Sequence, residues 1–359
     1  MLLRRVLFVL LGIGLLVGVL AGLGFAGVSV SMGRSFGSAT APIPPPRPVP
    51  SGPLTVAVVL GSQGSVTSDA LAPFDVFASS PKFFAYTVSA RREPVALSGG
   101  LHAIPDHTFD EALTPDVVVV PAVVDTDEQP LQDWIKRQAQ RGAHILGVCA
   151  GAEVLAKTGL LDGLSATTFW SDISGFASSY PAVHWVSGQR YVAQGLITTT
   201  AGVTSGIAGS LHVLAQLAGD AEAERIGQQV NYPGWSLHGS LAIPAQQLSL
   251  GDLPYGWNVA FPWLQPTWGI RLADGADEID VAAAFETYSG ASFAARLVPL
   301  GPHPTVTTKH GLTLLTTQST VDRTLALPHG YDDALQTLTD LEGPTIAHVA
   351  AKFMEYPMR

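Results

Sequence analysis

The chain has 359 residues, of which 47% are hydrophobic and 13% charged, so it can bury a core of ordinary size and is not disordered along its length. Its net charge of −10, with no Lys/Arg run beyond the first few residues, argues against a nucleic-acid partner, because phosphates need a basic surface. The single cysteine, Cys149, excludes an internal disulfide and a cysteine-rich zinc site.

The first predicted element is a membrane-spanning helix over residues 1–31. Arg4 and Arg5 precede an uncharged apolar run from Val6 to Val30, which is long enough to cross a bilayer core of roughly 30 Å. Arginines at the N-terminus place that end in the cytoplasm. We therefore expect a single-pass inner-membrane protein whose bulk is periplasmic. A cleaved signal peptide is the competing interpretation, although its apolar region would be shorter.

A Pro-rich linker follows over residues 32–53. Its segment Ala41–Pro53 reads APIPPPRPVPSGP, and proline fixes φ and removes backbone donors. We expect a semi-rigid, extended spacer, with a disordered tether as the alternative.

Residues 54–235 alternate short apolar runs with amphipathic or apolar helical patterns. The expected strands are 54–60, 84–90, 116–121 and 143–148, and the expected helices are 68–78, 131–141 and 150–158. Alternation at these lengths predicts an α/β fold with a parallel sheet and helices on both faces. In such sheets the working groups collect at the carboxyl ends of the strands.

Cys149 lies at one of these strand ends, between Val148 and Ala150-Gly151. A strand that turns sharply into a helix at a cysteine with small neighbours is typical of a nucleophile elbow. The N-terminus of the following helix would stabilise the thiolate and lower the thiol pKa. The alternative is a small buried apolar residue, which most lone cysteines are.

Three stretches resemble one family: Trp134–Trp170, Tyr191–Ile207 and the DALAP motif that begins at Asp69. They are similar to the DJ-1/PfpI (ThiJ/PfpI) family of the class I glutamine amidotransferase-like superfamily. The subgroup is the one that holds isonitrile hydratase-like proteins and the N-terminal domains of AraC-type regulators. The resemblance implies a flavodoxin-like three-layer sandwich and frequent homodimers.

The resemblance implies that Cys149 is the nucleophile and that Asp69 reaches toward it as a proton carrier. An alternative for Asp69 is a helix cap. The backbone N–H of Ala150, beside the sulfur, is the expected oxyanion donor. No cofactor and no metal site are predicted, because the ten histidines are scattered without HxH or HxxxH spacing.

Departures from the family pattern leave the chemistry open. Phe169 stands where many relatives have a histidine, and Ala150 stands where isonitrile hydratase-like members have a threonine. Ala122-Val123 replaces a Gly-Gly pair. His184 and His212 lie in the same unit, and we expect each to be a core or surface residue rather than a catalytic one.

The C-terminal part resembles a truncated second copy of the same unit over 265–359. Asp69 and Asp280 have similar contexts 211 positions apart, and Phe74 and Phe285 share that spacing. The copy lacks the elbow, so we expect it to pack on the first unit, as the partner does in a family dimer. The connector 236–264 is rich in proline and tryptophan, and core packing of its tryptophans is favoured over ligand binding.

The sequence thus predicts a membrane-anchored protein of DJ-1/PfpI type, with a hydrolase, hydratase or lyase that uses Cys149 on a small molecule as the leading hypothesis. The alternative is a non-catalytic ligand-binding or redox-sensing module at the cell envelope. A transcriptional regulator is disfavoured, because the C-terminal half shows the shortened copy instead of helix-turn-helix segments and the anchor would face away from DNA.

Overall fold

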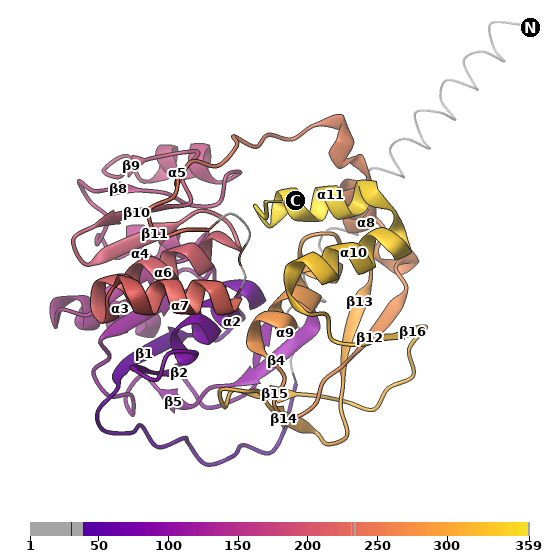
Figure 1. The fold of residues 1–359 in the computed structure, drawn as a ribbon, viewed down its shortest axis with the longest axis horizontal. Coiled ribbons are helices and arrows are strands. Elements are labelled where there is room, and N and C mark those ends of the chain that lie inside the picture. Colours follow the sequence, from indigo (N-terminus) through magenta and orange to yellow (C-terminus); the bar gives the residue numbers. More distant parts are fainter. Residues whose placement is uncertain (1–29, 31–38, 231, 233–234, 358–359) are drawn as a thin grey trace, which may run out of the picture.

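The computed structural model describes residues 30, 39–230, 232 and 235–357. The first unit is built on a seven-stranded sheet in the order β10-β11-β7-β6-β1-β2-β5. Figure 1 shows β10 and β11 at one end of this unit and β2 and β5 at the other. Only β10 is antiparallel to its neighbour. The strands are β1 (Leu54–Val59), β2 (Phe83–Ser89), β5 (His107–Thr108), β6 (Val117–Val120), β7 (His144–Gly147), β10 (Tyr191–Gln194) and β11 (Ile197–Thr200).

Helices cover both faces of this sheet because its central strands are apolar on both sides. Val56 and Val58 of β1 share one buried cluster with α2, α6 and α7, whereas Ala57 and Val59 share the other with α3 and α4. The helices are α2 (Thr67–Ala78), α3 (Gln129–Gln140), α4 (Gly151–Lys157), α5 (Ile173–Ser179), α6 (Ser205–Ala218) and α7 (Asp220–Val230). The strands and helices expected within 54–158 match these bounds to within two residues.

The second unit contains a three-stranded parallel sheet in the order β13-β12-β16. The strands of the whole second unit, inside and outside this sheet, are β12 (Thr267–Arg271), β13 (Arg296–Leu300), β14 (Thr305–Thr307), β15 (Thr313–Leu315) and β16 (Arg323–Leu325). Its helices are α9 (Glu278–Phe285), α10 (Gly330–Glu342) and α11 (Pro344–Phe353), with a single π-helical turn at Glu286–Gly290 after α9. The order β12-α9-β13 repeats β1-α2-β2, but its origin as a truncated copy stays a prediction.

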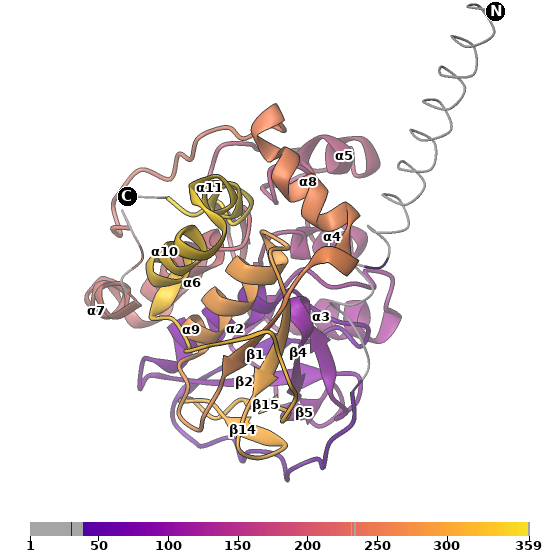
Figure 2. The same cartoon turned by 90° about the vertical axis from the view of Figure 1, so that its right-hand side faces the viewer.

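The two units share one core and one small sheet. Helix α9 packs against α2, and β15 pairs antiparallel with β4 (Leu101–Ile104), which pairs with β3 (Val95–Leu97) (Figure 2). Gly99 lies at a close approach of the two units, since a Cβ at this position, with φ of 81°, would lie 2.9 Å from the Phe285 carbonyl oxygen. Two further short strands, β8 (Ser165–Ala166) and β9 (His184–Trp185), pair with each other.

The Pro-rich segment is fixed to the fold at Arg47. The guanidinium pairs with Asp106 at 2.7 Å and donates to the His310 carbonyl at 2.8 Å. It therefore contacts both units, and the ring of Phe84 lies 5.2 Å from its central carbon. At Arg47 the segment is therefore packed on the fold, and its role as a semi-rigid spacer or a tether stays a prediction.

The connector contains α8 (Leu253–Ala260) and two 3-10 turns. Trp257 and Trp263 are 57% and 48% exposed, so the expectation of core packing is wrong for these two, whereas Trp268, just beyond the connector in β12, is buried. Leu248 and Leu250 in the same segment are also exposed.

No helix among the described residues is long and apolar enough to cross a bilayer. The longest of them, α6, has 14 residues. At 1.5 Å per residue it would span about 21 Å of the roughly 30 Å of a bilayer core. The predictions of a membrane-spanning helix, a membrane partner and a single-pass inner-membrane location with a periplasmic bulk are therefore wrong for the described chain. The segment 1–31 that prompted them lies outside the described residues, apart from Val30.

Candidate active site

The candidate nucleophile lies where the chain turns from β7 into α4. Cys149 has a φ of 55°, one of three non-glycine residues with positive φ among those described. A residue with a Cβ is strained in this backbone conformation, and the strain persists only where the surrounding structure enforces it. Gly151 is part of that enforcement, because a Cβ there would overlap the Val120 carbonyl oxygen. Thr168 also fixes the turn by donating its hydroxyl to the Cys149 carbonyl at 2.9 Å.

The thiol is enclosed. Cys149 is 6% exposed, and burial raises the pKa of its thiol well above the usual range, with Asp69 and Asp172 adding to the rise. Backbone hydrogen bonds from Val203 and Ala150 to the side chain act in the opposite direction. The expected lowering of the thiol pKa is therefore wrong, because burial outweighs the donors at the start of α4.

Asp69 meets Cys149 from the first turn of α2. Its carboxyl lies near enough to the thiol for each group to shift the pKa of the other. Oδ2 accepts from the Ala122 N–H at 3.2 Å, and Oδ1 has no hydrogen-bonding partner among the described residues. Burial, followed by the charge of Glu286, raises the pKa of Asp69 well above its usual range. The carboxyl makes no cap to its own helix. Asp69 and Cys149 thus influence each other's pKa, and the catalytic role of Asp69 stays a prediction.

Two buried carboxyls of the second unit adjoin this pair, and the sequence did not predict either. Glu286 accepts a hydrogen bond from Ser98 at 3.3 Å, and burial raises its pKa to about 7. Glu355 follows α11, has a φ of 51°, and has a pKa that burial raises to about 7. No local motif marks them, since each reaches the site only through the packing of the two units.

Glu355 occupies backbone donors directly beside the thiol. Its carboxylate accepts from the N–H of Gly202 at 2.7 Å and from the N–H of Trp170 at 3.3 Å. The next residue after Gly202 is Val203, whose backbone bonds to the Cys149 side chain. The backbone of Gly202 thus bonds to Glu355, and the backbone of the next residue, Val203, bonds to the thiol.

Phe169, which replaces the family histidine, and the histidines at positions 184 and 212 make no hydrogen bond to the Cys149 or Asp69 side chains among the described residues. Phe169 packs against Trp170 with ring centroids 5.4 Å apart. His212 lies against Tyr191, 4.7 Å between centroids, and burial lowers its pKa. His184 is exposed in β9. Neither histidine hydrogen-bonds to Cys149 or Asp69, in line with the expectation of core or surface roles.

One group of potential metal ligands comes together away from the elbow: a carboxylate oxygen each of Asp75 and Glu278 and a ring nitrogen of His310 lie within 4.8 Å of one another. The sequence did not predict it. Its ligand atoms already have protein partners, because Glu278 accepts from the His310 ring at 2.8 Å and Asp75 accepts from the Ile279 N–H at 3.1 Å. The geometry is explained by these hydrogen bonds alone.

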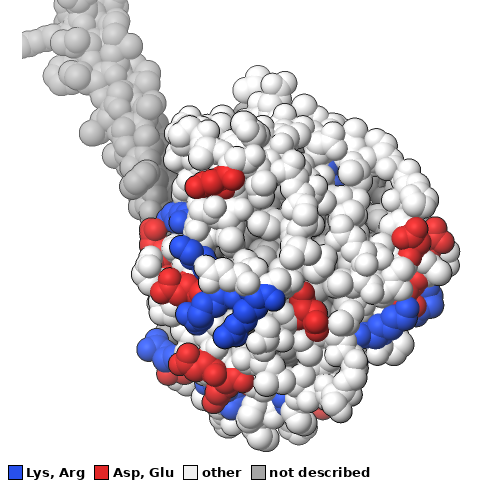
Figure 3. All heavy atoms as spheres, turned by 90° about the vertical axis from the view of Figure 1, so that its left-hand side faces the viewer, with Lys and Arg blue, Asp and Glu red and all other residues white. Residues whose placement is uncertain are grey.

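Charges of both signs are interspersed on the face shown in Figure 3, which has no continuous basic patch. The absence of a nucleic-acid partner stays a prediction, as does a homodimer.

Comparison with known proteins shows which proteins the first unit is similar to. The model of the DJ-1/PfpI family matches residues 55–216. Isonitrile hydratase of Pseudomonas putida is 33% identical over 171 residues, which cover 46% of this chain and 72% of that protein. The HTH-type transcriptional regulator CdhR of Pseudomonas aeruginosa is 30% identical over 147 residues, 40% of this chain and 44% of the regulator. A ThiJ/PfpI family protein from Pseudomonas syringae aligns with a TM-score of 0.46 and 25% identity, over 52% of this chain and 77% of that one.

Proposed function

Because the chain belongs to the DJ-1/PfpI family, we propose that it is a hydratase or hydrolase that uses Cys149 as nucleophile on a small molecule. The observation that carries the proposal is the position of the Cys149 side chain at a strained strand-to-helix turn, within electrostatic range of the buried carboxyl of Asp69. Strain of this kind is concentrated at functional sites, and a nucleophile within reach of a proton carrier is the arrangement that covalent catalysis requires.

The raised pKa values of both groups favour a neutral resting pair, thiol and carboxylic acid. Such a pair moves protons without creating a charge in the low-dielectric interior. The carboxyl of Asp69 can deliver its own proton to a substrate while it accepts the proton of the thiol. General acid–base transfer of this type typically accelerates a reaction by about a hundredfold to ten-thousandfold.

Hydration of an isonitrile shows how bonds and protons balance in such a reaction. The sulfur of Cys149 bonds to the terminal carbon, Asp69 protonates that carbon, and the thiol proton replaces the one that Asp69 gave. Water then adds to the resulting thioimidate carbon while the nitrogen is protonated. Cleavage of the carbon–sulfur bond releases the N-substituted formamide, and the sulfur recovers its proton through Asp69.

Charge that develops on the bound substrate has donors nearby. The backbone groups of Ala150 and Val203 that bond to the resting sulfur are the natural partners for such charge. Substrate access requires the C-terminal segment to move, because Glu355 holds the amides beside the thiol.

A ligand-binding module without turnover is the second candidate, and the enclosure of the thiol favours it. Redox sensing is less well supported, since sensor cysteines are exposed and have low pKa values. The predicted membrane anchor was one of two reasons to disfavour a transcriptional regulator, and it no longer counts. The remaining reason is that the C-terminal half resembles a shortened copy of the first unit instead of helix-turn-helix segments.

The test is incubation of the protein with isonitriles, methylglyoxal and small amides, followed by product analysis. We expect turnover that Cys149→Ser abolishes and Asp69→Asn reduces by about a hundredfold or more, while the exposed control His184→Ala retains it. Alkylation of Cys149 should have a midpoint above the ordinary thiol pKa. Asp69→Asn should lower that midpoint, because Asp69, once ionised at alkaline pH, opposes formation of the thiolate. Protection of Cys149 from alkylation without product would select the binding module instead.

A further inference from the structure

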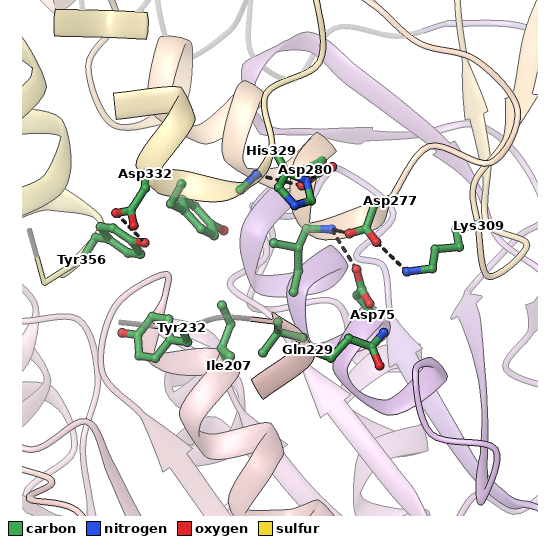
Figure 4. A pocket seen from close by; sticks show the side chains of 14 residues that line it. Asp75, Ile207, Gln229, Tyr232, Asp277, Asp280, Lys309, His329, Asp332 and Tyr356 are labelled. Carbon is green, nitrogen blue, oxygen red and sulfur yellow. Dashed lines mark hydrogen bonds and ion pairs between the residues drawn. The ribbon is translucent and has the colours of Figure 1, made fainter. Parts of the chain in front are cut away.

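A cavity of about 260 Å³ lies between the two units (Figure 4), and Cys149 is not among the residues that line it. Ile207 of α6 and Gln229 of α7 line it from the first unit. The N-terminal part of α9, the start of α10 and the C-terminal segment line it from the second. A space of this size accommodates a small organic molecule rather than a single ion.

One side of the cavity is aromatic. Tyr331 and Tyr356 have ring centroids 5.3 Å apart, and Tyr232 lies 6.0 Å from Tyr356. Their hydroxyls are held by the protein: Tyr331 donates to Ser68 at 2.9 Å, Tyr356 donates to Asp332 at 3.0 Å and Tyr232 accepts from Arg190 at 2.7 Å. The tyrosines therefore offer an occupant ring surface, which is electron-rich and attracts cations.

The other side of the cavity is acidic. Asp280 accepts from the Gly330 N–H at 2.8 Å and faces the exposed His329 ring at 3.4 Å, and it forms no Lys or Arg ion pair among the described residues. Asp277 is neutralised by Lys309 at 2.8 Å. Figure 4 shows these side chains together at the end of the cavity opposite Tyr356 and Tyr232.

Charge balance across the lining favours a positive occupant. Four aspartates line the cavity against one lysine and one histidine. Burial raises the pKa of Asp75 well above its usual range. Burial and then the charge of Asp277 also raise the pKa of Asp280, whereas the Gly330 N–H and the His329 ring favour its ionised form. The net charge of −10 on the chain also raises the local concentration of cations.

We propose that this cavity binds a small amphipathic amine in its ammonium form. The ammonium group donates hydrogen bonds to Asp280, and the apolar part lies against the tyrosine rings and Ile207. Neither Cys149 nor any turnover is involved, so the proposal stands apart from the proposed function.

The test uses three probes of one shape: benzylamine, benzyl alcohol and benzoate, which are cationic, neutral and anionic at pH 7. Isothermal calorimetry on the full chain should give saturable binding of benzylamine, with an affinity at least about tenfold higher than for the other two. Asp280→Asn should weaken benzylamine binding by about tenfold, since the amide keeps the acceptor and loses the charge. The matched control Asp340→Asn, on the exposed face of α10, should not change it.

Gln229→Lys provides a second variant in case Asp280→Asn impairs folding. Gln229 is exposed and lines the cavity, so a lysine there is tolerated and repels an ammonium ion. It should abolish benzylamine binding without a change in the thermal midpoint of the free protein. Equal affinity for benzylamine and benzyl alcohol, preference for benzoate, no saturable binding of benzylamine, or no effect of either variant would each overturn the proposal.

Discussion

Replacing Glu355 by glutamine should change how the stability of the protein depends on pH. The folded state holds a proton on Glu355 up to about pH 7, whereas an unfolded chain releases it near 4.5. Between these values the folded state binds more protons than the unfolded state, so the free energy of unfolding falls as pH rises through this window. Above the pKa that Glu355 has in the folded state, the stabilisation from this proton is fully lost.

The size of the effect follows from the shift. One pH unit of difference corresponds to about 1.4 kcal/mol, so Glu355 should cost the wild-type protein about 2.5 kcal/mol between pH 5 and pH 8. Glutamine carries no charge at either pH, and its carbonyl oxygen can still accept from the Gly202 N–H. Glu286, with a similar pKa, is present in both proteins and cancels in the comparison.

The assay is urea unfolding followed by tryptophan fluorescence at several pH values. The stability of the glutamine variant should fall by about 2.5 kcal/mol less than that of the wild type from pH 5 to pH 8, with an unchanged dependence on urea. Glu224→Gln, at an exposed position of α7, should follow the wild-type curve. Parallel curves for wild type and Glu355→Gln would show that this carboxyl is ionised in the folded protein and would refute the reasoning.

Two further predictions concern the frame around the site. Gly151→Ala should destabilise the protein by about 3 kcal/mol in thermal unfolding, because the new methyl overlaps a carbonyl of β6, whereas Gly175→Ala, with open space in α5, should be neutral or stabilising by up to about 1 kcal/mol. Arg47→Ala should lower the free energy of unfolding by about 3 kcal/mol, because it leaves the buried Asp106 carboxylate unpaired. Arg91→Ala, in an exposed pair, should lower it by less than about 1 kcal/mol. Equal losses would contradict the docking of the Pro-rich segment.

Local patterns predicted the first unit and the turn at Cys149. Apolar runs bounded by Gly and Pro give the strands, and the small residues after Cys149 give the elbow, because both depend on neighbours in the chain. The proximity of Asp69 came from the family resemblance, which carries information on packing that spacing alone does not.

The parts that the sequence did not predict depend on burial and on distant segments. The sign of the thiol pKa shift was wrong because the number of atoms that shield Cys149 is a property of the assembled fold. Glu286 and Glu355 were missed because each lies in an unremarkable local sequence and reaches the site through the second unit. The tyrosine cavity likewise combines residues from both units, and a hydropathy pattern along the chain cannot show it.

The supply of Glu286 and Glu355 from the same polypeptide has a consequence for concentration dependence. A site completed by a separate subunit would come apart on dilution, at a concentration set by the association constant. Here the completing groups are covalently tethered, so dilution leaves the site whole. Titration of the thiol should therefore give one stoichiometric group per chain with a profile that is the same at nanomolar and micromolar protein.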